Sequence, residues 1–310
     1  MTKKKTRTKV IGKKPNSYEK VTDAIVESLQ LGDIPWNSPY IRRYPQNFTK
    51  GNIYRGINYF LLGMDDALYQ SYATFNQIKN NGGKVNKGAK SRLVYFFKML
   101  EIETKQKLKS TGETIKKDIP FLRTYNVFKL EDTNLDPSLF IEIGDAANED
   151  KKEVHQKIDI ALELFFTNTT LTQKLGGKCG TYSPMSDCVR IPDTTNYKNL
   201  DSRYSTIFHE LVHATGHESR LNRDLKGFDI DKHSYSLEEL VAEMGAAILC
   251  THFGIASEKL IENKKAYCQS WAKYLNSDTK LAYKAASKAQ KAVDFILERM
   301  NELETTKKAA

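Results

Sequence analysis

Apolar residues recur along the chain at spacings that predict several amphipathic helices. Apolar side chains three or four positions apart lie on one face of a helix. This spacing occurs in residues 17–29, 201–216, 236–254 and 257–305. The last segment is interrupted at residues 276–278, so it predicts two helices that pack in the core. Ser17 is the expected N-terminal cap of the first helix, and Asp201 or Ser202 that of the second.

Runs of β-branched and aromatic residues predict strands between these helices. They cover residues 93–97 and 124–130, and two short strands within 180–192 flank a turn at 184–187. The edge of this second pair is either an ordinary sheet edge or a place where an extended peptide substrate adds as a strand. We expect an α+β fold with two domains.

Charge divides the chain into two unequal halves. The net charge is +10, but residues 1–130 carry 25 Lys and Arg against 10 Asp and Glu, and the remainder is mildly acidic. Residues 131–150 hold seven acidic residues and no basic one. We therefore predict a basic domain at 1–140, a linker at 141–152 and a second domain at 153–310. Residues 1–14 are expected to form a disordered basic arm.

The basic half combines cations with aromatic residues on predicted loops. Lysine and arginine neutralise phosphates, and aromatic faces stack on bases, so this combination favours binding of single-stranded nucleic acid. The candidate contacts are Trp36, Tyr40, Arg42, Arg43, Tyr54, Arg55, Asn58, Lys84, Lys87 and Lys90. Other aromatic residues of this half, such as Tyr59 and Phe60, are expected in the core. A lysine-rich solvated surface is the alternative interpretation.

Composition argues against membrane and secreted classes. No apolar run approaches the roughly 18 residues that span a bilayer, and the basic start is followed by no apolar segment of a secretory signal. The four cysteines form no CxxC pair, which is typical of free thiols in a reducing compartment. We expect a cytoplasmic protein.

The sharpest motif is His209-Glu-Leu-Val-His213, an HExxH pattern within a predicted helix. Residues four apart share one helix face, so both imidazoles can hold one Zn²⁺ while Glu210 reaches a metal-bound water as general base. The alternative is a surface helix carrying two unrelated histidines.

A catalytic zinc needs a third protein ligand, and the second predicted helix offers two glutamates. We choose Glu239 as the ligand and Glu243, one turn later, as the carboxylate that orients a ligand imidazole. The alternative assigns the metal to Glu243 and leaves Glu239 as the capping partner of Ser236. Glu238 is expected to face solvent.

Three further residues are relevant to the predicted zinc site: His217, Ser219 and Tyr235. His217 is too far from His209 to share the ion unless the helix breaks at Gly216, and Ser219 stands where one class of zinc peptidases has a third histidine. Either Tyr235 or His217 is expected to stabilise the oxyanion of the reaction.

Together these motifs resemble the ArdC-type antirestriction proteins of plasmids and other mobile elements. The N-terminal resemblance is carried by Pro35-Trp36, Tyr54-Arg-Gly-Ile-Asn58, Val85-Asn-Lys-Gly88 and Tyr125-Asn-Val-Phe128. The C-terminal resemblance is carried by Tyr182-Ser-Pro184, Asp187-Cys-Val-Arg-Ile-Pro192, the residues from His209 to His217, Ser219-Arg-Leu-Asn222 and Glu238-Glu-Leu-Val-Ala-Glu243. The chain departs from the usual pattern at Tyr40 and Lys129.

This resemblance implies a two-domain α+β protein, with an N-terminal mixed α/β domain that binds single-stranded DNA and a C-terminal zincin-like metallopeptidase domain. It also implies protection of incoming DNA during transfer and a cytoplasmic location. Two other functions stay open. One is a DNA-coating protein whose zinc site is catalytically idle, and the other is a DNA-dependent protease that acts on DNA-bound proteins.

Overall fold

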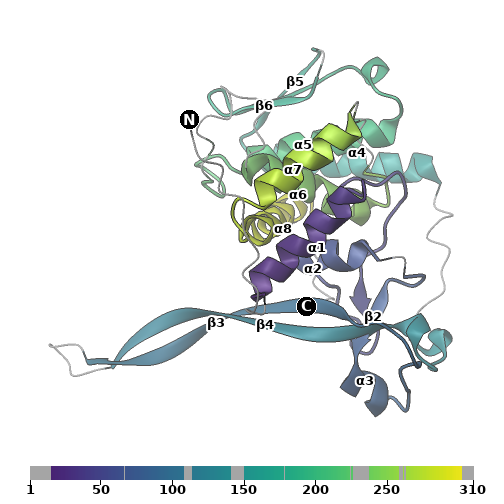
Figure 1. Ribbon diagram of the computed structural model, residues 1–310. Helices are drawn as coiled ribbons and strands as arrows, with labels where there is room; N and C mark the ends of the chain where they lie inside the picture. The colour runs from purple at the N-terminus through teal and green to yellow at the C-terminus, as the bar shows by residue number, and fades with distance from the viewer. Residues whose placement is uncertain are drawn as a thin grey trace, which may run out of the picture.

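The chain folds into a helical body and a four-stranded sheet, from which two long strands project as a hairpin (Figure 1). The structure, a computed structural model, describes residues 15–65, 67–107, 114–140, 150–177, 179–223, 225, 237–257, 261 and 263–301. The predicted arm at 1–14 and residues 141–149 of the predicted linker lie outside the described residues. Helices and strands alternate in the N-terminal half, and both sheets contain antiparallel pairs. The expected α+β class with two domains is confirmed.

The N-terminal region contains three helices and the four-stranded sheet. The helices are α1 (Ser17–Gln30), α2 (Ile57–Gly63) and α3 (Phe75–Asn80). The strands are β1 (Gln46–Asn47), β2 (Ser71–Thr74), β3 (Arg92–Lys107) and β4 (Thr114–Lys129), in the order β1-β2-β4-β3. Helix α1 is capped by Asn16, one residue before the expected Ser17, because Asn16 and Glu19 exchange side-chain to backbone hydrogen bonds.

The C-terminal region adds a second group of helices and a small sheet. Its helices are α4 (Lys151–Thr167), α5 (Leu200–Ala214), α6 (Leu237–Phe253), α7 (Lys264–Leu275) and α8 (Leu281–Arg299). Its strands are β5 (Thr172–Leu175), β6 (Thr181–Ser183) and β7 (Cys188–Ile191), with β7 in the middle. The two strands expected around the turn at 184–187 are β6 and β7. Asn199, and neither Asp201 nor Ser202, caps α5.

One hydrophobic core extends across the predicted domain boundary. Ile25 of α1 and Phe60 of α2 belong to the same buried cluster as Trp271 of α7 and Ala286 of α8. Helix α8 presents fully buried alanines on this side, so its neighbours approach closely. The change of charge near residue 141 therefore separates two regions of the chain that are packed on a common core.

Helices α5 and α6 pack so closely that Gly245 is required between them. A Cβ atom at this position would lie 2.6 Å from Cγ2 of Val212, which is closer than side chains allow. This contact brings the first turn of α6 beside the last two turns of α5. Among the described helices, none is both long enough and apolar enough to cross a lipid bilayer.

Candidate metal centre

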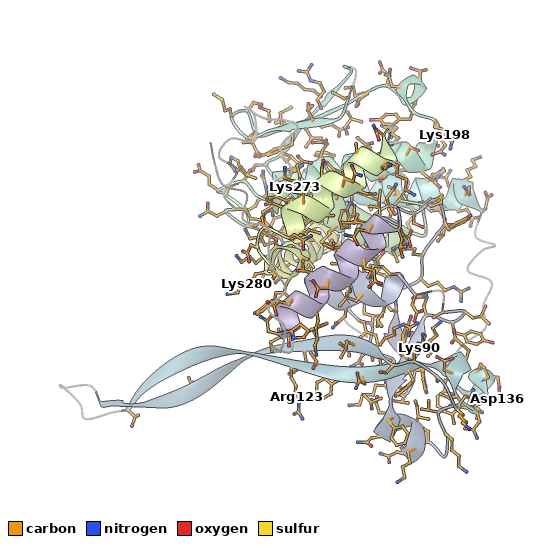
Figure 2. The ribbon with its side chains drawn as sticks, in the orientation of Figure 1. Lys90, Arg123, Asp136, Lys198, Lys273 and Lys280 are labelled. Carbon is orange, nitrogen blue, oxygen red and sulfur yellow. The ribbon has the colours of Figure 1, made fainter. Side chains whose placement is uncertain are left out.

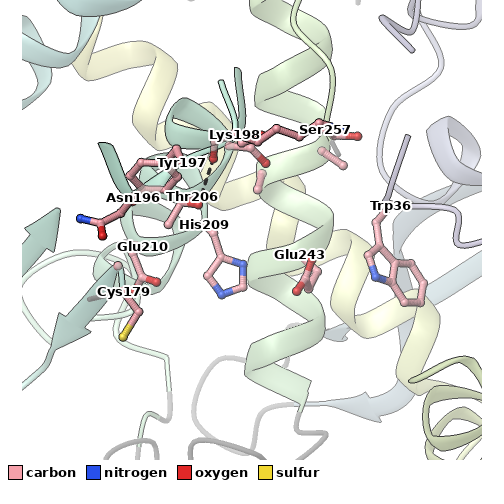
Figure 3. A pocket seen from close by; sticks show the side chains of 15 residues that line it. Trp36, Cys179, Asn196, Tyr197, Lys198, Thr206, His209, Glu210, Glu243 and Ser257 are labelled. Carbon is pink, nitrogen blue, oxygen red and sulfur yellow. Dashed lines mark hydrogen bonds between the residues drawn. The ribbon is translucent and has the colours of Figure 1, made fainter. Parts of the chain in front are cut away.

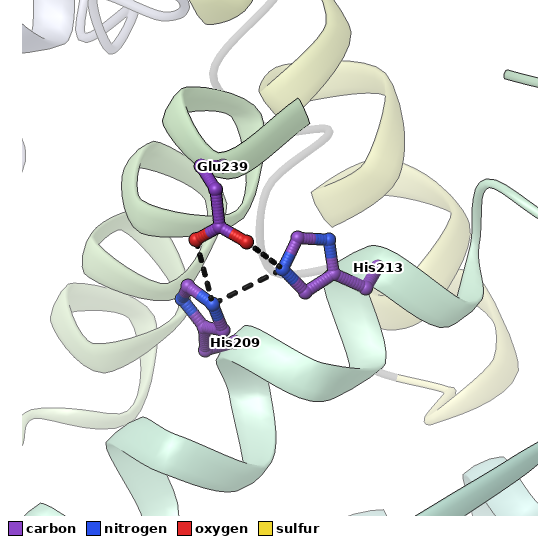
Figure 4. A group of neighbouring side chains, drawn as sticks. All are labelled: His209, His213 and Glu239. Atoms are coloured by element: carbon purple, nitrogen blue, oxygen red, sulfur yellow. Dashed lines mark hydrogen bonds and ion pairs between the residues drawn. The ribbon is translucent and has the colours of Figure 1, made fainter. Parts of the chain in front are cut away.

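Helices α5 and α6 bring three side chains of metal-ligand type together. His209 and His213 lie one turn apart on α5, and Glu239 lies in the first turn of α6. The two Nε2 atoms are 3.1 Å apart, and the Glu239 carboxylate oxygens lie 3.6 Å from His209 Nε2 and 3.4 Å from His213 Nε2. Figure 4 shows the two imidazoles and the carboxylate converging on one point.

The spacing of these atoms fits a tetrahedral metal ion. Zinc bonds to nitrogen and oxygen are about 2.0–2.2 Å long, so two ligand atoms at a tetrahedral angle lie roughly 3.3 Å apart. One ligand atom from each of the three residues lies within 4.8 Å of the others. Three protein ligands leave the fourth position for water or substrate, which is the arrangement of a catalytic site.

The carboxylate that orients His213 is Glu238, which we expected to face solvent. Its Oε1 atom lies 3.3 Å from His213 Nδ1, and the residue is only 9% exposed. Arg223 donates hydrogen bonds of 2.9 and 2.6 Å to the two Glu238 oxygens and a third to the carbonyl of Val212. The expectation was wrong because Arg223, from the segment that follows α5, covers this carboxylate and balances its charge.

Electrostatics at the centre favour a bound cation. Burial raises the pKa values of Glu238 and Glu239, but hydrogen bonds from Arg223 and His213 outweigh it and leave both lowered. Burial lowers the pKa of His213, and hydrogen bonds to Glu238 and Glu239 raise it to about 9. Two ionised carboxylates therefore surround the imidazole, and a metal ion would replace the proton that they attract.

Glu210 lies on the same helix and faces a pocket beside the metal ligands (Figure 3). It is 7% exposed, and Gly180, just before β6, packs against its side chain. Tyr197 also lines this pocket. Burial raises the pKa of the Tyr197 hydroxyl, and the Glu210 carboxylate adds to that rise. The carboxylate that we predict to act as general base thus lies in a partly enclosed site next to the predicted zinc position.

Glu243 lines the pocket together with His209. The group of atoms that fits a metal includes Glu239 and leaves Glu243 outside it, in keeping with our choice of ligand. The role of Glu243 in orienting an imidazole stays a prediction. Ser236, the alternative capping partner of Glu239, lies outside the described residues.

Of the two expected oxyanion donors, the structure describes only His217, which is not among the residues that line this pocket. His217 lies beyond the end of α5, where its Nδ1 atom is 2.8 Å from Ser219 Oγ. Tyr235 lies outside the described residues. Tyr197 is the pocket-lining phenol that the sequence analysis missed, and no motif around it distinguishes it from the other tyrosines of the chain.

The fold and both halves of the chain match known proteins. Residues 15–128 match the family described as the N-terminal domain of anti-restriction factor ArdC. Residues 160–288 match the family of zincin-like metallopeptidases. The crystal structure of the metal-free antirestriction protein ArdC from plasmid R388 is 31% identical, with a TM-score of 0.69, over 92% of this chain and 98% of the ArdC chain.

The chain belongs to the ArdC-type antirestriction proteins. A second crystal structure of the R388 protein is described as Mn(II)-bound and matches with a TM-score of 0.70 at the same identity. The metal-binding property of that relative agrees with the ligand geometry found in this ArdC-type chain.

Other relatives show that this ArdC-type unit also occurs within longer proteins. Two Escherichia coli proteins named DNA primase TraC are 29% and 28% identical over 92% of this chain. This chain spans only 27% and 20% of their lengths. A Sinorhizobium fredii protein named y4eC is 26% identical over 90% of this chain and 91% of its own length.

Trp36 does not offer the stacking face that we expected from it. It is 2% exposed, its ring packs edge-on against Trp271 at 5.7 Å, and its Nε1 atom donates to the Tyr267 hydroxyl. The flanking prolines suggested a loop, and the loop is present, but it folds onto α7. Trp36 is a core residue that also lines the pocket formed by His209, Glu210 and their neighbours, which we call the metal pocket.

Other predicted DNA contacts are engaged within the protein. Asn58 exchanges hydrogen bonds with the backbone of Tyr95 on β3. Arg55 forms an ion pair with Asp294 of α8, and Arg42 donates to the carbonyl of Pro35 at 2.6 Å. Tyr54 accepts a hydrogen bond from Asn47 and is partly buried.

The candidates with exposed side chains are Tyr40, Arg43, Lys84, Lys87 and Lys90.

Proposed function

We propose that this antirestriction protein binds single-stranded DNA and carries a zinc metallopeptidase site. The observation that supports the peptidase site most directly is the convergence of His209, His213 and Glu239 beside the buried Glu210. A purely structural metal site has four protein ligands and needs no general base. The arrangement therefore favours hydrolysis over a catalytically idle zinc site.

The residues of the chain have distinct roles in this reaction. A zinc ion bound by the two histidines and Glu239 would supply Lewis-acid polarisation of the scissile carbonyl and an acidified water. The Glu210 carboxylate accepts the proton of the attacking water and returns it to the amine of the leaving peptide. Glu238 fixes His213 in one ring orientation through Nδ1, while Arg223 keeps Glu238 ionised.

An extended peptide is the substrate shape that the pocket favours. Strand β6 lies at the edge of its sheet, with β7 on one side. Gly180 leads directly into this strand and packs against Glu210. A peptide added to the free edge of β6 as a further strand would pass the general base.

DNA binding is proposed for the basic N-terminal region. Its excess of 15 positive charges suits a polyphosphate partner, and Lys84, Lys87 and Lys90 are exposed around a glycine-rich turn. Trp36, which belongs to this region, lines the metal pocket. The proposed DNA-binding region and the proposed peptidase site therefore adjoin one another. This arrangement favours a second candidate function, in which DNA binding stimulates cleavage of DNA-bound proteins.

The test is cleavage of an unfolded protein by the zinc-loaded full chain. We expect wild type to cleave it and Glu210→Gln to be inactive while retaining its metal. Glu218→Gln, an exposed acid just beyond α5, is the matched control and should keep full activity. Equal cleavage by wild type and Glu210→Gln would contradict the peptidase assignment. Stimulation by added single-stranded DNA would favour the DNA-dependent protease.

A further inference from the structure

Among the described side chains of the hairpin of β3 and β4, two aromatic rings are exposed. Phe96 on β3 is 50% exposed and Tyr125 on β4 is 38% exposed. The guanidinium of Arg123 lies 5.1 Å from the centre of the Tyr125 ring. The sequence analysis assigned none of these three residues to DNA binding, because each stands within a predicted strand or beside one.

The pairing of the strands places all three side chains on one face. Phe96 stands directly opposite Arg123, and Val94 directly opposite Tyr125. Side chains of directly paired residues, and of residues two apart on one strand, share a face of the sheet. Phe96 and Tyr125 are therefore diagonal neighbours, about 7–8 Å apart, with Arg123 beside both.

This part of the face is turned away from the helices. Figure 2 shows Arg123 on the side of the hairpin opposite the helical body. Val94, directly opposite Tyr125, and Val127, two residues farther along β4, lie on the same face and pack with Leu62 of α2. Phe96, Arg123 and Tyr125 therefore lie next to the part of this face that packs against α2, and they are themselves exposed.

Charge on this face suits an anionic partner. Arg92 and Lys129 pair with Asp65, which is 4% exposed. Among the described residues, no carboxylate pairs with Arg123. Residues 92–129 as a whole contain nine Lys or Arg and four Asp or Glu. Exposed rings beside a guanidinium, on a strand hairpin of net positive charge, match a ligand that has both flat π-faces and phosphates.

We propose that Phe96, Arg123 and Tyr125 form a stacking surface for single-stranded DNA. The inference rests on the proposed DNA-binding function and assigns its place on the molecule. Adjacent bases stack on the two rings, and the Arg123 guanidinium contacts the phosphate between them. Duplex DNA binds less well, because its bases are already stacked on one another.

The stacking surface is tested by titrating a fluorescently labelled oligothymidylate with the full chain. Phe96→Ala and Tyr125→Ala should each raise the Kd about 5- to 150-fold, the range for loss of one stacked base. Tyr125→Phe keeps the ring and should bind nearly as wild type does. Phe75→Ala, which removes an equally exposed ring from α3, is the matched control and should leave the Kd unchanged.

The role of Arg123 has a separate readout in the salt dependence. Loss of one phosphate contact should reduce the slope of log K against log salt by about 0.7 for a single strand. Arg123→Ala should show this reduction, and Lys273→Ala, on an exposed position of α7, should not. Unchanged melting temperatures would establish that each variant is folded.

Two failures are distinguishable. A wild-type chain that binds no single-stranded DNA would overturn the proposed function together with this surface. Wild-type binding that survives both Phe96→Ala and Tyr125→Ala would overturn the stacking surface alone and return the DNA site to the exposed lysines around residue 87.

Discussion

At His213, the two ring nitrogens face two neighbouring residues of one helix turn. Nε2 lies beside Glu239 and Nδ1 beside Glu238. The HExxH spacing was sufficient to predict the histidines and Glu210, because residues four apart on a helix share a face whatever packs around them. Helix spacing alone did not predict that Glu239 would lie beside Nε2 of His213 and Glu238 beside Nδ1. This arrangement depends on Arg223, which reaches Glu238 from the segment between the helices.

Glu238→Gln should weaken zinc binding about 10- to 100-fold, since the change removes the charged hydrogen-bond partner of a ligand imidazole. Competition with a chromogenic chelator would measure the affinity. Glu218→Gln should leave it unchanged. Equal zinc affinity of the Glu238→Gln variant and wild type would contradict the role assigned to this carboxylate.

Asp187 offers a pH-dependent test outside the metal centre. Burial raises its pKa, but hydrogen bonds from Arg220 and Tyr182 outweigh that effect and lower it below the ordinary value. The stability from this carboxylate is therefore present above the unfolded pKa of about 3.9 and is lost as the pH falls through the folded value.

Asp187→Asn should lower the unfolding free energy at pH 7 by about 1–3 kcal/mol, because Arg220 loses its charged partner. The difference from wild type should shrink as the pH falls below about 4. Urea denaturation of both proteins across this range is the measurement. A difference that grows toward low pH would reverse the sign of the argument.

At the scale of elements, the long amphipathic helices were predictable and the lengths of the strands were not. The expected strands at 93–97 and 124–130 correspond to the parts of two 16-residue strands that lie nearest the helical body, except that Leu130 follows the end of β4. Charged residues in the outer parts break the apolar alternation that the prediction used. Helix α4 was missed because its start falls in the region assigned to a linker.

The closeness of α5 and α6 is the element-level feature on which the metal centre depends. Gly245→Ala should destabilise the protein by about 1–3 kcal/mol and weaken zinc binding, because the added methyl group pushes against Val212. In the double variant Gly245→Ala, Val212→Ala, the smaller neighbour makes room. Its loss of stability should be less than the sum of the two single losses. Additive losses in a denaturation experiment would show that the helices do not meet at this point.

At the scale of the whole molecule, composition predicted two regions, and the structure joins them through one core. The distribution of charged residues describes the surface of the protein, because charged side chains are mostly exposed. The shared core consists of apolar residues from both halves of the chain. Trp36 illustrates the difference, because its neighbours in sequence are loop formers and its neighbours in space are Tyr267 and Trp271.

Trp36→Ala should therefore lower the unfolding free energy by about 3–5 kcal/mol, the usual cost of removing a large buried ring. Fluorescence and circular dichroism should report a single transition at a reduced urea midpoint, because both regions unfold with their common core. Unchanged stability accompanied by weaker DNA binding would instead place Trp36 on the DNA surface.

The central claim is that two histidines of α5 and one glutamate of α6 hold the catalytic metal. An anomalous difference map of zinc-loaded crystals, recorded at the zinc absorption edge, tests it most directly. We predict one peak within about 2.0–2.2 Å of His209 Nε2, His213 Nε2 and a carboxylate oxygen of Glu239. Glu238 should stay bound to His213 Nδ1, outside the coordination sphere. A peak bound by Glu243 or His217 in place of Glu239, or no peak between α5 and α6, would contradict this account.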